Sequence, residues 1–256
     1  MTTASVKRFL LRQWTSILKR LRFHRPNKAD WAFLERMPAG HRGRLAALTL
    51  QSTSQNCQDL LVLSFTNFKR GGFFVEFGAA DGKSLSNTWL LEKRFAWKGI
   101  IAEPTQSYEK RLRMNRSCSV DTRCVWSTSG ELVQFREARN RVLSTIDRFA
   151  SLDMHAEARQ EGVTYPVATV SLEDLLLEHR APASPDFLSI DTEGSEYEIL
   201  RVFDFTRWRF KLICCEHAYT AARDQLHQLL TSHGYQRIHQ DISLYDDWYV
   251  LTEIDP

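Results

Sequence analysis

Cysteine is scarce in this sequence, and its spacing excludes two kinds of site. The count is five, an odd number, and no Cys-x-x-Cys pair occurs. Such a set argues against a disulfide framework and against a zinc site. The neighbours Cys214 and Cys215 fall in a predicted strand, so we expect them to be buried on opposite faces of it. A reducing compartment is the simplest interpretation, and we expect a cytoplasmic protein.

Long apolar runs and a strong net charge are also absent. No stretch reaches the ~18 apolar residues that a membrane-spanning helix needs. We expect no secretory signal, because Arg12 and Gln13 interrupt the apolar stretch 9–18. The formal net charge of +3 is small, and a nucleic-acid footprint would need clustered basic residues. We therefore expect no nucleic acid as a partner.

Length and composition indicate one large domain with an appendage. The chain has 256 residues, 43% hydrophobic and 25% charged, which is ordinary for a soluble globular protein. Residues 1–50 are rich in Arg and Lys and carry apolar residues at helical spacing. We expect a basic, helical N-terminal appendage at 1–50 and the main domain at 51–256.

The first helix of the appendage is predicted to be amphipathic and cationic. Residues 1–25 could lie on an anionic membrane surface, which would place the protein at the inner face of the membrane. The alternative is that the apolar stripe docks on the main domain or on a second copy of the chain, as in a homodimer. Docking is the commoner fate of such stripes.

From residue 55 onward the pattern alternates between helices and strands. This alternation predicts a parallel sheet with helices on both faces, whose ligands lie at the carboxyl ends of the strands. Residues 136–165 show no clear period, so we expect a long functional or mobile loop there. Capping boxes are predicted at Ser171 to Asp174 and at Ser195 to Glu198. The predicted strands are 73–77, 99–102, 119–126, 132–135, 167–170, 187–190, 212–215, 235–239 and 248–252.

A glycine-containing loop follows the first of these strands. It reads Gly78-Ala79-Ala80-Asp81-Gly82, and Glu103 ends the next strand. Glycines allow a sharp turn close to a ligand, and a carboxylate about 20 residues further on can bind ribose hydroxyls. A dinucleotide site needs glycines where Ala80 and Lys83 stand, so NAD and FAD are disfavoured. A plain strand-to-helix turn remains the alternative.

With these features, the sequence resembles the FkbM family of methyltransferases. The resemblance covers roughly residues 54–252 and leaves the first fifty residues uncovered. It includes the signature Asp191-Thr192-Glu193-Gly194-Ser195-Glu196 near the end of the chain. The other matching segments are Ser54-Gln55, Gln58-Asp59, 74–82, Ser86-Asn87-Thr88, Leu91-Glu92-Lys93, Trp97-Lys98-Gly99 and Glu103-Pro104.

The resemblance implies a fold, a cofactor and a set of binding residues. The fold would be α/β, the Rossmann-like class I methyltransferase fold, with a mostly parallel seven-stranded sheet. The donor would be S-adenosylmethionine, and the acceptor a hydroxyl of a sugar or of a polyketide-like natural product. Glu76 would orient the methionine amino group, Asn87 would lie near the same loop, and Glu103 would bind the ribose. The residues expected to line the methionine and ribose portion are Gly78, Ala79, Asp81 and Gly82.

Candidate catalytic residues follow the predicted strands 187–190 and 212–215. A hydroxyl acceptor needs a general base as its bond to the methyl group forms. Asp191 ends a buried strand beside the cofactor loop, and the ordinary histidine pKa of ~6.5 also suits the task. Glu196 and Glu198 are expected to cap a helix, where the dipole favours negative charge. The catalytic candidates are Asp191, His217, Glu216 and Glu193.

Three of these candidates are acids that could instead bind a metal ion together. Carboxylate oxygens suit Mg²⁺, which could bind and acidify the acceptor hydroxyl. The same oxygens could equally bind sugar hydroxyls by hydrogen bonds. The metal hypothesis therefore stays open for Asp191, Glu193 and Glu216. No metal-ligand spacing marks the remaining histidines, which we expect to be solvated or packed: His155, His179, His227, His233 and His239.

The function expected from these features is an O-methyltransferase acting on a sugar, a glycan or a glycosylated natural product, as in polysaccharide biosynthesis. Three alternatives remain. One is a regulatory protein that binds S-adenosylmethionine without catalysis. Another is an N-methyltransferase of a small metabolite. The third, an NAD-dependent enzyme, is disfavoured by Ala80.

Overall fold

The computed structural model describes residues 28–252. Its centre is a seven-stranded sheet in which six strands run in one direction and β11 runs in the opposite direction. The α/β prediction is confirmed, and the sheet is mixed rather than fully parallel. In spatial order its strands are β10 (Tyr235–Ile238), β11 (Asp246–Leu251), β9 (Leu212–Glu216), β8 (Phe187–Ile190), β1 (Phe73–Phe77), β2 (Lys98–Ala102) and β3 (Ser119–Asp121).

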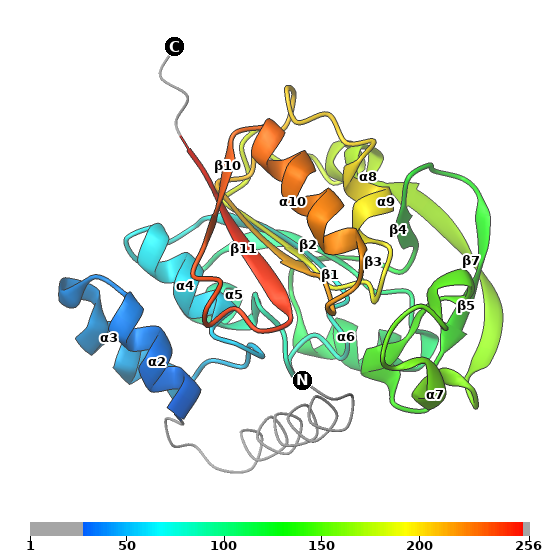
Figure 1. The fold of residues 1–256 in the computed structure, drawn as a ribbon, viewed down its shortest axis with the longest axis horizontal. Coiled ribbons are helices and arrows are strands. Elements are labelled where there is room, and N and C mark those ends of the chain that lie inside the picture. Colours follow the sequence, from blue (N-terminus) through cyan, green and yellow to red (C-terminus); the bar gives the residue numbers. More distant parts are fainter. Residues whose placement is uncertain (1–27, 253–256) are drawn as a thin grey trace.

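Helices cover both faces of this sheet, as predicted (Figure 1). Neighbouring strand residues point to opposite faces, so Val75 packs with the helices of one face and Phe74 with those of the other. Cys215 and Cys214 divide in the same way, both buried and unbonded, which confirms their prediction. One face carries α8 (Leu172–Glu178), α9 (Glu196–Leu200) and α10 (Ala222–Ser232), and the other carries α4 (Gln58–Phe65), α5 (Trp89–Phe95) and α6 (Glu109–Asn115).

A second sheet of four strands stands beside the first. Its order is β4-β7-β5-β6. The predicted strand 119–126 was wrong, because it divides into β3 and β4 in different sheets. The Asp121 carboxylate accepts the Arg123 backbone N–H at 2.9 Å and so turns the chain between them. The strands of this sheet are β4 (Cys124–Trp126), β5 (Leu132–Glu137), β6 (Thr145–Ile146) and β7 (Val163–Ser171).

The segment 136–165 contains helices and strands, so the prediction of one long loop over this range was wrong, although part of the segment lines the pocket described below. It contains the end of β5, all of β6 and the start of β7. Its apolar residues do not share one burial pattern, because Leu143 and Ile146 are buried whereas Leu152, Met154 and Val163 are exposed. That irregular pattern explains why no period was visible in the sequence. Between the strands lie η2 (Arg141–Leu143), η3 (Asp147–Phe149) and α7 (Ala156–Arg159).

Two helices of the predicted appendage fall within the described residues. They are α2 (Lys28–Arg36) and α3 (Ala39–Thr49). Phe33 and Leu45 are buried in the same apolar cluster as Leu60 of α4 and Trp248 of β11. These helices therefore share a core with the main domain, and the boundary at residue 50 stays a prediction.

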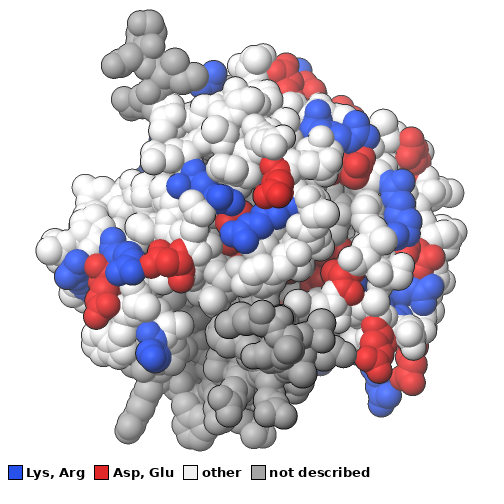
Figure 2. All heavy atoms as spheres, in the orientation of Figure 1, with Lys and Arg blue, Asp and Glu red and all other residues white. Residues whose placement is uncertain are grey.

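The predicted helix at residues 1–25, with its membrane or dimer contact, lies outside the described residues. Within residues 28–252, no helix is long and apolar enough to cross a membrane. Figure 2 shows basic and acidic side chains interspersed on one face of the molecule. On this face the described residues therefore form no continuous basic track.

Candidate functional site

Four neighbouring strands of the large sheet end at one edge. Phe77 of β1 is in register with Ala102 of β2 and with Ile190 of β8, and Ile190 is in register with Cys215 of β9. The residues that follow these positions are therefore brought together. They are Gly78, Glu103, Asp191 and Glu216.

A pocket of about 1020 Å³, counting its open mouth, lies at this edge. The four strand-end residues all line it, so a pocket at the carboxyl ends of the strands is present as predicted. Its opposite wall comes from the segment 141–146 and from His155. The pocket thus lies between the large sheet and the segment that connects strands of the small one.

Gly78 brings the loop 78–82 into direct contact with Asp191, which follows the neighbouring strand β8. Its φ is +74°, and a Cβ placed on it would lie 1.8 Å from the backbone oxygen of Asp191. Only glycine fits both the left-handed backbone and this approach. Gly82 is similarly constrained, with a φ of +78° and a built Cβ 2.7 Å from Leu112 Cδ1. The two glycines therefore fix the path of the loop between the pocket and α6.

Glu103 presents a fixed carboxylate in the pocket wall. The Ala80 backbone N–H donates to its Oε2 at 2.8 Å, and the Thr105 backbone N–H donates to its Oε1 at 2.9 Å. Burial raises the pKa of this carboxyl above its usual range, although these hydrogen bonds act against that. The Thr105 side chain also hydrogen-bonds this carboxylate, and these three donors do not fill all the lone pairs of its two oxygens. The carboxylate can therefore accept hydroxyl groups from a ligand.

Glu76 does not line the pocket. Its side chain is occupied by other residues of the chain, so its predicted contact with the cofactor stays a prediction. Its Oε2 accepts the hydroxyls of Ser86 at 2.9 Å and Thr88 at 2.6 Å, and Oε1 accepts the Asn87 backbone N–H at 2.6 Å. Arg116, buried beside it, forms an ion pair with the same carboxylate. Glu76 thus anchors the segment that follows the cofactor loop.

Asp81, Ala79, Gly82 and Asn87 are likewise absent from the pocket lining. The Asp81 carboxylate accepts the Ser84 backbone N–H at 2.7 Å and closes the loop on itself. The Asn87 amide donates to Ser189 Oγ at 2.9 Å, which ties the loop to β8. The structure therefore gives these predicted binding residues a role in shaping the loop, while Gly78 and Glu103 face the pocket.

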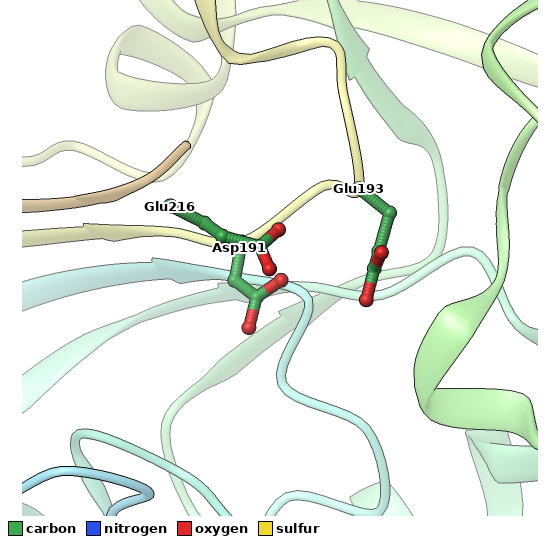
Figure 3. Close-up of side chains that lie close together, drawn as sticks. All are labelled: Asp191, Glu193 and Glu216. Carbon is green, nitrogen blue, oxygen red and sulfur yellow. The ribbon is translucent and has the colours of Figure 1, made fainter. Parts of the chain in front are cut away.

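Three acids form a cluster where β8 and β9 end (Figure 3). One oxygen from each of Asp191, Glu193 and Glu216 lies within 4.8 Å of the others. Asp191 is partly open to the pocket, whereas the two glutamates are buried. Burial, followed by the charge of Asp246, raises the pKa of Asp191 to about 7. Burial and the Asp191 charge also raise the pKa of both glutamates well above their usual range, although the Arg159 charge acts in the opposite direction at Glu193.

The metal hypothesis for this cluster stays a prediction. The donor set is oxygen-only, as Mg²⁺ prefers, and Glu216 Oε2 is buried without a hydrogen-bond partner. However, the Arg159 guanidinium already forms an ion pair with Glu193 at 2.6 Å. A shared proton between Asp191 and Glu216 is an alternative way to relieve the repulsion of two carboxylates.

His217 is brought to a different place from the one expected. It does not line the pocket. Its Nδ1 accepts the Tyr219 backbone N–H at 3.0 Å, and its Nε2 lies 3.8 Å from Asp247 Oδ1. Burial lowers its pKa to about 4. The geometry does not support His217 as the general base, because the side chain is packed behind the pocket wall.

The two predicted capping boxes have different outcomes. At α8, Ser171 Oγ accepts the Asp174 backbone N–H at 3.1 Å, as predicted. At α9 the box is wrong, because Ser195 Oγ donates to the Thr192 hydroxyl instead. Glu196 does stabilise the turn that leads into α9, since its Oε1 accepts the Thr192 backbone N–H at 2.9 Å.

Several pocket residues were missed by sequence reasoning. His155, Arg141 and Tyr245 all line the pocket, but none stands beside a recognisable turn or motif in the sequence. Gln55 also lines it, and its place in the upstream part of the family resemblance was the only signal. These residues reach the pocket through tertiary packing, so local patterns could not find them.

The raised pKa of Asp191 predicts how stability depends on pH. In the fold its pKa rises from 3.8 to about 7, so between these values the folded state binds more protons than the unfolded state. Stability therefore falls as pH rises through this window. Asp191→Asn cannot ionise, so we expect it to raise the melting temperature by roughly 5 °C at pH 8. Thermal denaturation at pH 3.5 should show no such difference, and an equal gain at both pH values would contradict the assignment.

The comparisons with known proteins identify the class of this chain. The family model "Methyltransferase FkbM domain" matches residues 76–237. The chain therefore belongs to the FkbM methyltransferase family, which confirms the resemblance found in the sequence. None of the curated proteins compared with the chain matches it.

Solved structures of other methyltransferases are also similar to the chain. One is the precorrin-6y C5,15-methyltransferase from Geobacter metallireducens, with 13% identity and a TM-score of 0.38 over 70% of this chain and 71% of that one. Another is a putative RNA methyltransferase from Pyrococcus horikoshii, with 10% identity and a TM-score of 0.37 over 83% of each chain.

Proposed function

We propose that this methyltransferase uses S-adenosylmethionine to methylate a hydroxyl group of a sugar, a glycan or a glycosylated natural product. One observation carries the proposal. The loop suited to a nucleoside cofactor and the acid suited to a general base are in backbone contact, because Gly78 packs on the oxygen of Asp191. A donor held by the loop would therefore have its reactive end beside the acid cluster.

The residues present fit S-adenosylmethionine. Glu103 offers a fixed carboxylate for the two ribose hydroxyls. Gly78 lines the pocket without a side chain, so a ligand can approach the backbone closely there. When bound, the cofactor would supply an electrophilic methyl group on its sulfonium. No pyrophosphate contact is needed, which agrees with alanine at position 80.

Asp191 is the residue best placed to take the acceptor proton. It lines the pocket, and its pKa of about 7 suits a general base at neutral pH. Glu216, next to it at the end of β9, can share the proton that Asp191 receives, because the two carboxyls are in hydrogen-bond contact. The pocket walls would have to hold the hydroxyl in line with the methyl group for transfer to occur.

The cofactor site is tested by replacing Glu103. Glu103→Ala removes the proposed ribose contact, so we expect S-adenosylmethionine to bind roughly 10- to 100-fold more weakly by titration calorimetry. Glu161→Ala is the matched control, since Glu161 is an exposed acid paired only at the surface with Arg139. Unchanged affinity in Glu103→Ala, or heat with NAD instead, would rule out this binding mode.

The acceptor is tested by turnover. Methyl transfer from labelled S-adenosylmethionine to a panel of glycosides and glycans should give a product methylated on oxygen, as mass spectrometry and NMR would show. A product methylated on nitrogen would favour the small-metabolite alternative. Cofactor binding without any turnover would favour the regulatory alternative. Contact of residues 1–25 with a membrane, and homodimer formation, stay predictions.

A further inference from the structure

One buried arginine joins the acid cluster to the opposite wall of the pocket. Arg159 ends α7, and only 1% of its side chain is exposed. Arginine is almost never buried to this degree unless it is paired. Its Nη2 donates to Glu193 Oε2 at 2.6 Å, and its Nη1 donates to Asp153 Oδ1 at 2.7 Å. Its Nε donates to the backbone oxygen of Leu143, a pocket residue, at 2.6 Å.

Glu193 is held in an unusual backbone conformation by the same segment. Its φ is +58°, in the left-handed region. A residue other than glycine stays there only when its surroundings fix it. Thr145 Oγ1 donates to the Glu193 backbone oxygen at 3.0 Å. Two independent contacts from segment 143–159 therefore hold Glu193, one on its side chain and one on its backbone.

We propose that Arg159 is a positioning residue, which fixes the Glu193 carboxylate beside Asp191 and so couples the 141–146 wall of the pocket to the site of methyl transfer. The inference rests on the proposed function. Arg159 does not line the pocket, so it acts through Glu193. Its planar fork binds Glu193, Asp153 and the Leu143 oxygen at once, which a lysine ammonium cannot reproduce in the same geometry.

Two cofactor analogues report on the charge at the methyl position without requiring the acceptor. S-adenosylhomocysteine lacks the methyl group, whereas sinefungin carries an ammonium group at that point. The ratio of their dissociation constants therefore measures the negative charge facing the position. Titration calorimetry with the full chain should show that sinefungin binds more tightly to the wild type.

Two substitutions separate the charge of Glu193 from its placement. Glu193→Gln removes the charge but keeps an acceptor for Arg159, and we expect it to reduce the preference for sinefungin about tenfold. Arg159→Lys keeps the positive charge but loses the fork, and we expect a loss of about fivefold. The affinity for S-adenosylhomocysteine should change less than twofold in both variants.

The double variant decides whether Arg159 acts through Glu193. Added to Glu193→Gln, the change Arg159→Lys should reduce the preference by less than a further twofold, because the contact is already altered. Additive losses would overturn the proposal, and so would an equal loss of affinity for both analogues. If Arg159→Lys fails to fold, Asp153→Asn weakens the contact that holds the other arm of the Arg159 guanidinium, and a preference for sinefungin unchanged from wild type would overturn the proposal.

Binding of the two analogues to the wild type distinguishes a failure of the proposed function from a failure of the inference about Arg159. Failure to bind either analogue would contradict the proposed function and the inference with it. Binding of both analogues with equal affinity would leave the cofactor site standing and overturn the inference, because no fixed negative charge would then face the methyl position.

Discussion

Asp191→Asn is expected to lower the rate of methyl transfer by about 10²- to 10⁴-fold, the usual contribution of a general base. The substitution keeps the size of the side chain and its place beside Gly78, so the affinity for S-adenosylhomocysteine, which carries no charge at the methyl position, should change less than threefold. Wild-type turnover should rise with pH through about 7, because the pKa of Asp191 is raised to about 7 and only its deprotonated form can accept a proton. Turnover is measured with the acceptor that the screen identifies, and cofactor affinity is measured by titration calorimetry.

The control for this prediction is a distant aspartate. Asp241 is exposed and pairs at the surface with Arg36, so Asp241→Asn should leave both turnover and its pH dependence unchanged. Turnover close to wild type in Asp191→Asn would remove Asp191 from the mechanism. Residual turnover in Asp191→Asn that still falls at acid pH as in the wild type would show that another group controls the acid side of the profile.

Gly78→Ala should disrupt the cofactor site more severely than any change to a single binding side chain. The added methyl would lie 1.8 Å from the Asp191 backbone oxygen, so β1 and β8 or the loop between them must move. We expect the affinity for S-adenosylmethionine to fall at least about 100-fold and the protein to lose about 3 kcal/mol of stability or more, through steric overlap added to backbone strain.

Gly130→Ala separates strain from overlap. Gly130 also has a positive φ, +82°, but a Cβ there would meet nothing within 4 Å. We therefore expect Gly130→Ala to cost only about 1 kcal/mol and to leave cofactor binding intact. Calorimetry and thermal denaturation of the two variants give the comparison. Similar behaviour of both would contradict the close contact between the loop and Asp191.

The sequence predicted those parts of the site that lie next to buried strands. Gly78, Glu103 and Asp191 each follow a short apolar run, and parallel strands bring such positions to one edge. The acid cluster followed from the same logic, because Glu216 ends the neighbouring strand. Local patterns were sufficient here, since one strand register places all of these residues.

The parts that sequence reasoning missed depend on contacts between distant segments. Glu76 belongs to the motif around the loop, yet its carboxylate accepts hydrogen bonds from the hydroxyls of Ser86 and Thr88, ten and twelve residues further along the chain. His217 follows a strand as Asp191 does, but it packs toward Asp247 rather than into the pocket. Arg159 lies in a segment without any period, and only the folded structure brings it to Glu193. No pattern of spacing encodes these pairings.

A crystal structure of the complex with S-adenosylmethionine would test the central claim most directly. In this complex we expect both ribose hydroxyls on the Glu103 carboxylate, the cofactor along the loop at Gly78, and the sulfonium methyl facing Asp191. A cofactor bound elsewhere in the chain, or bound in this pocket with its methyl group turned away from Asp191, would contradict that claim.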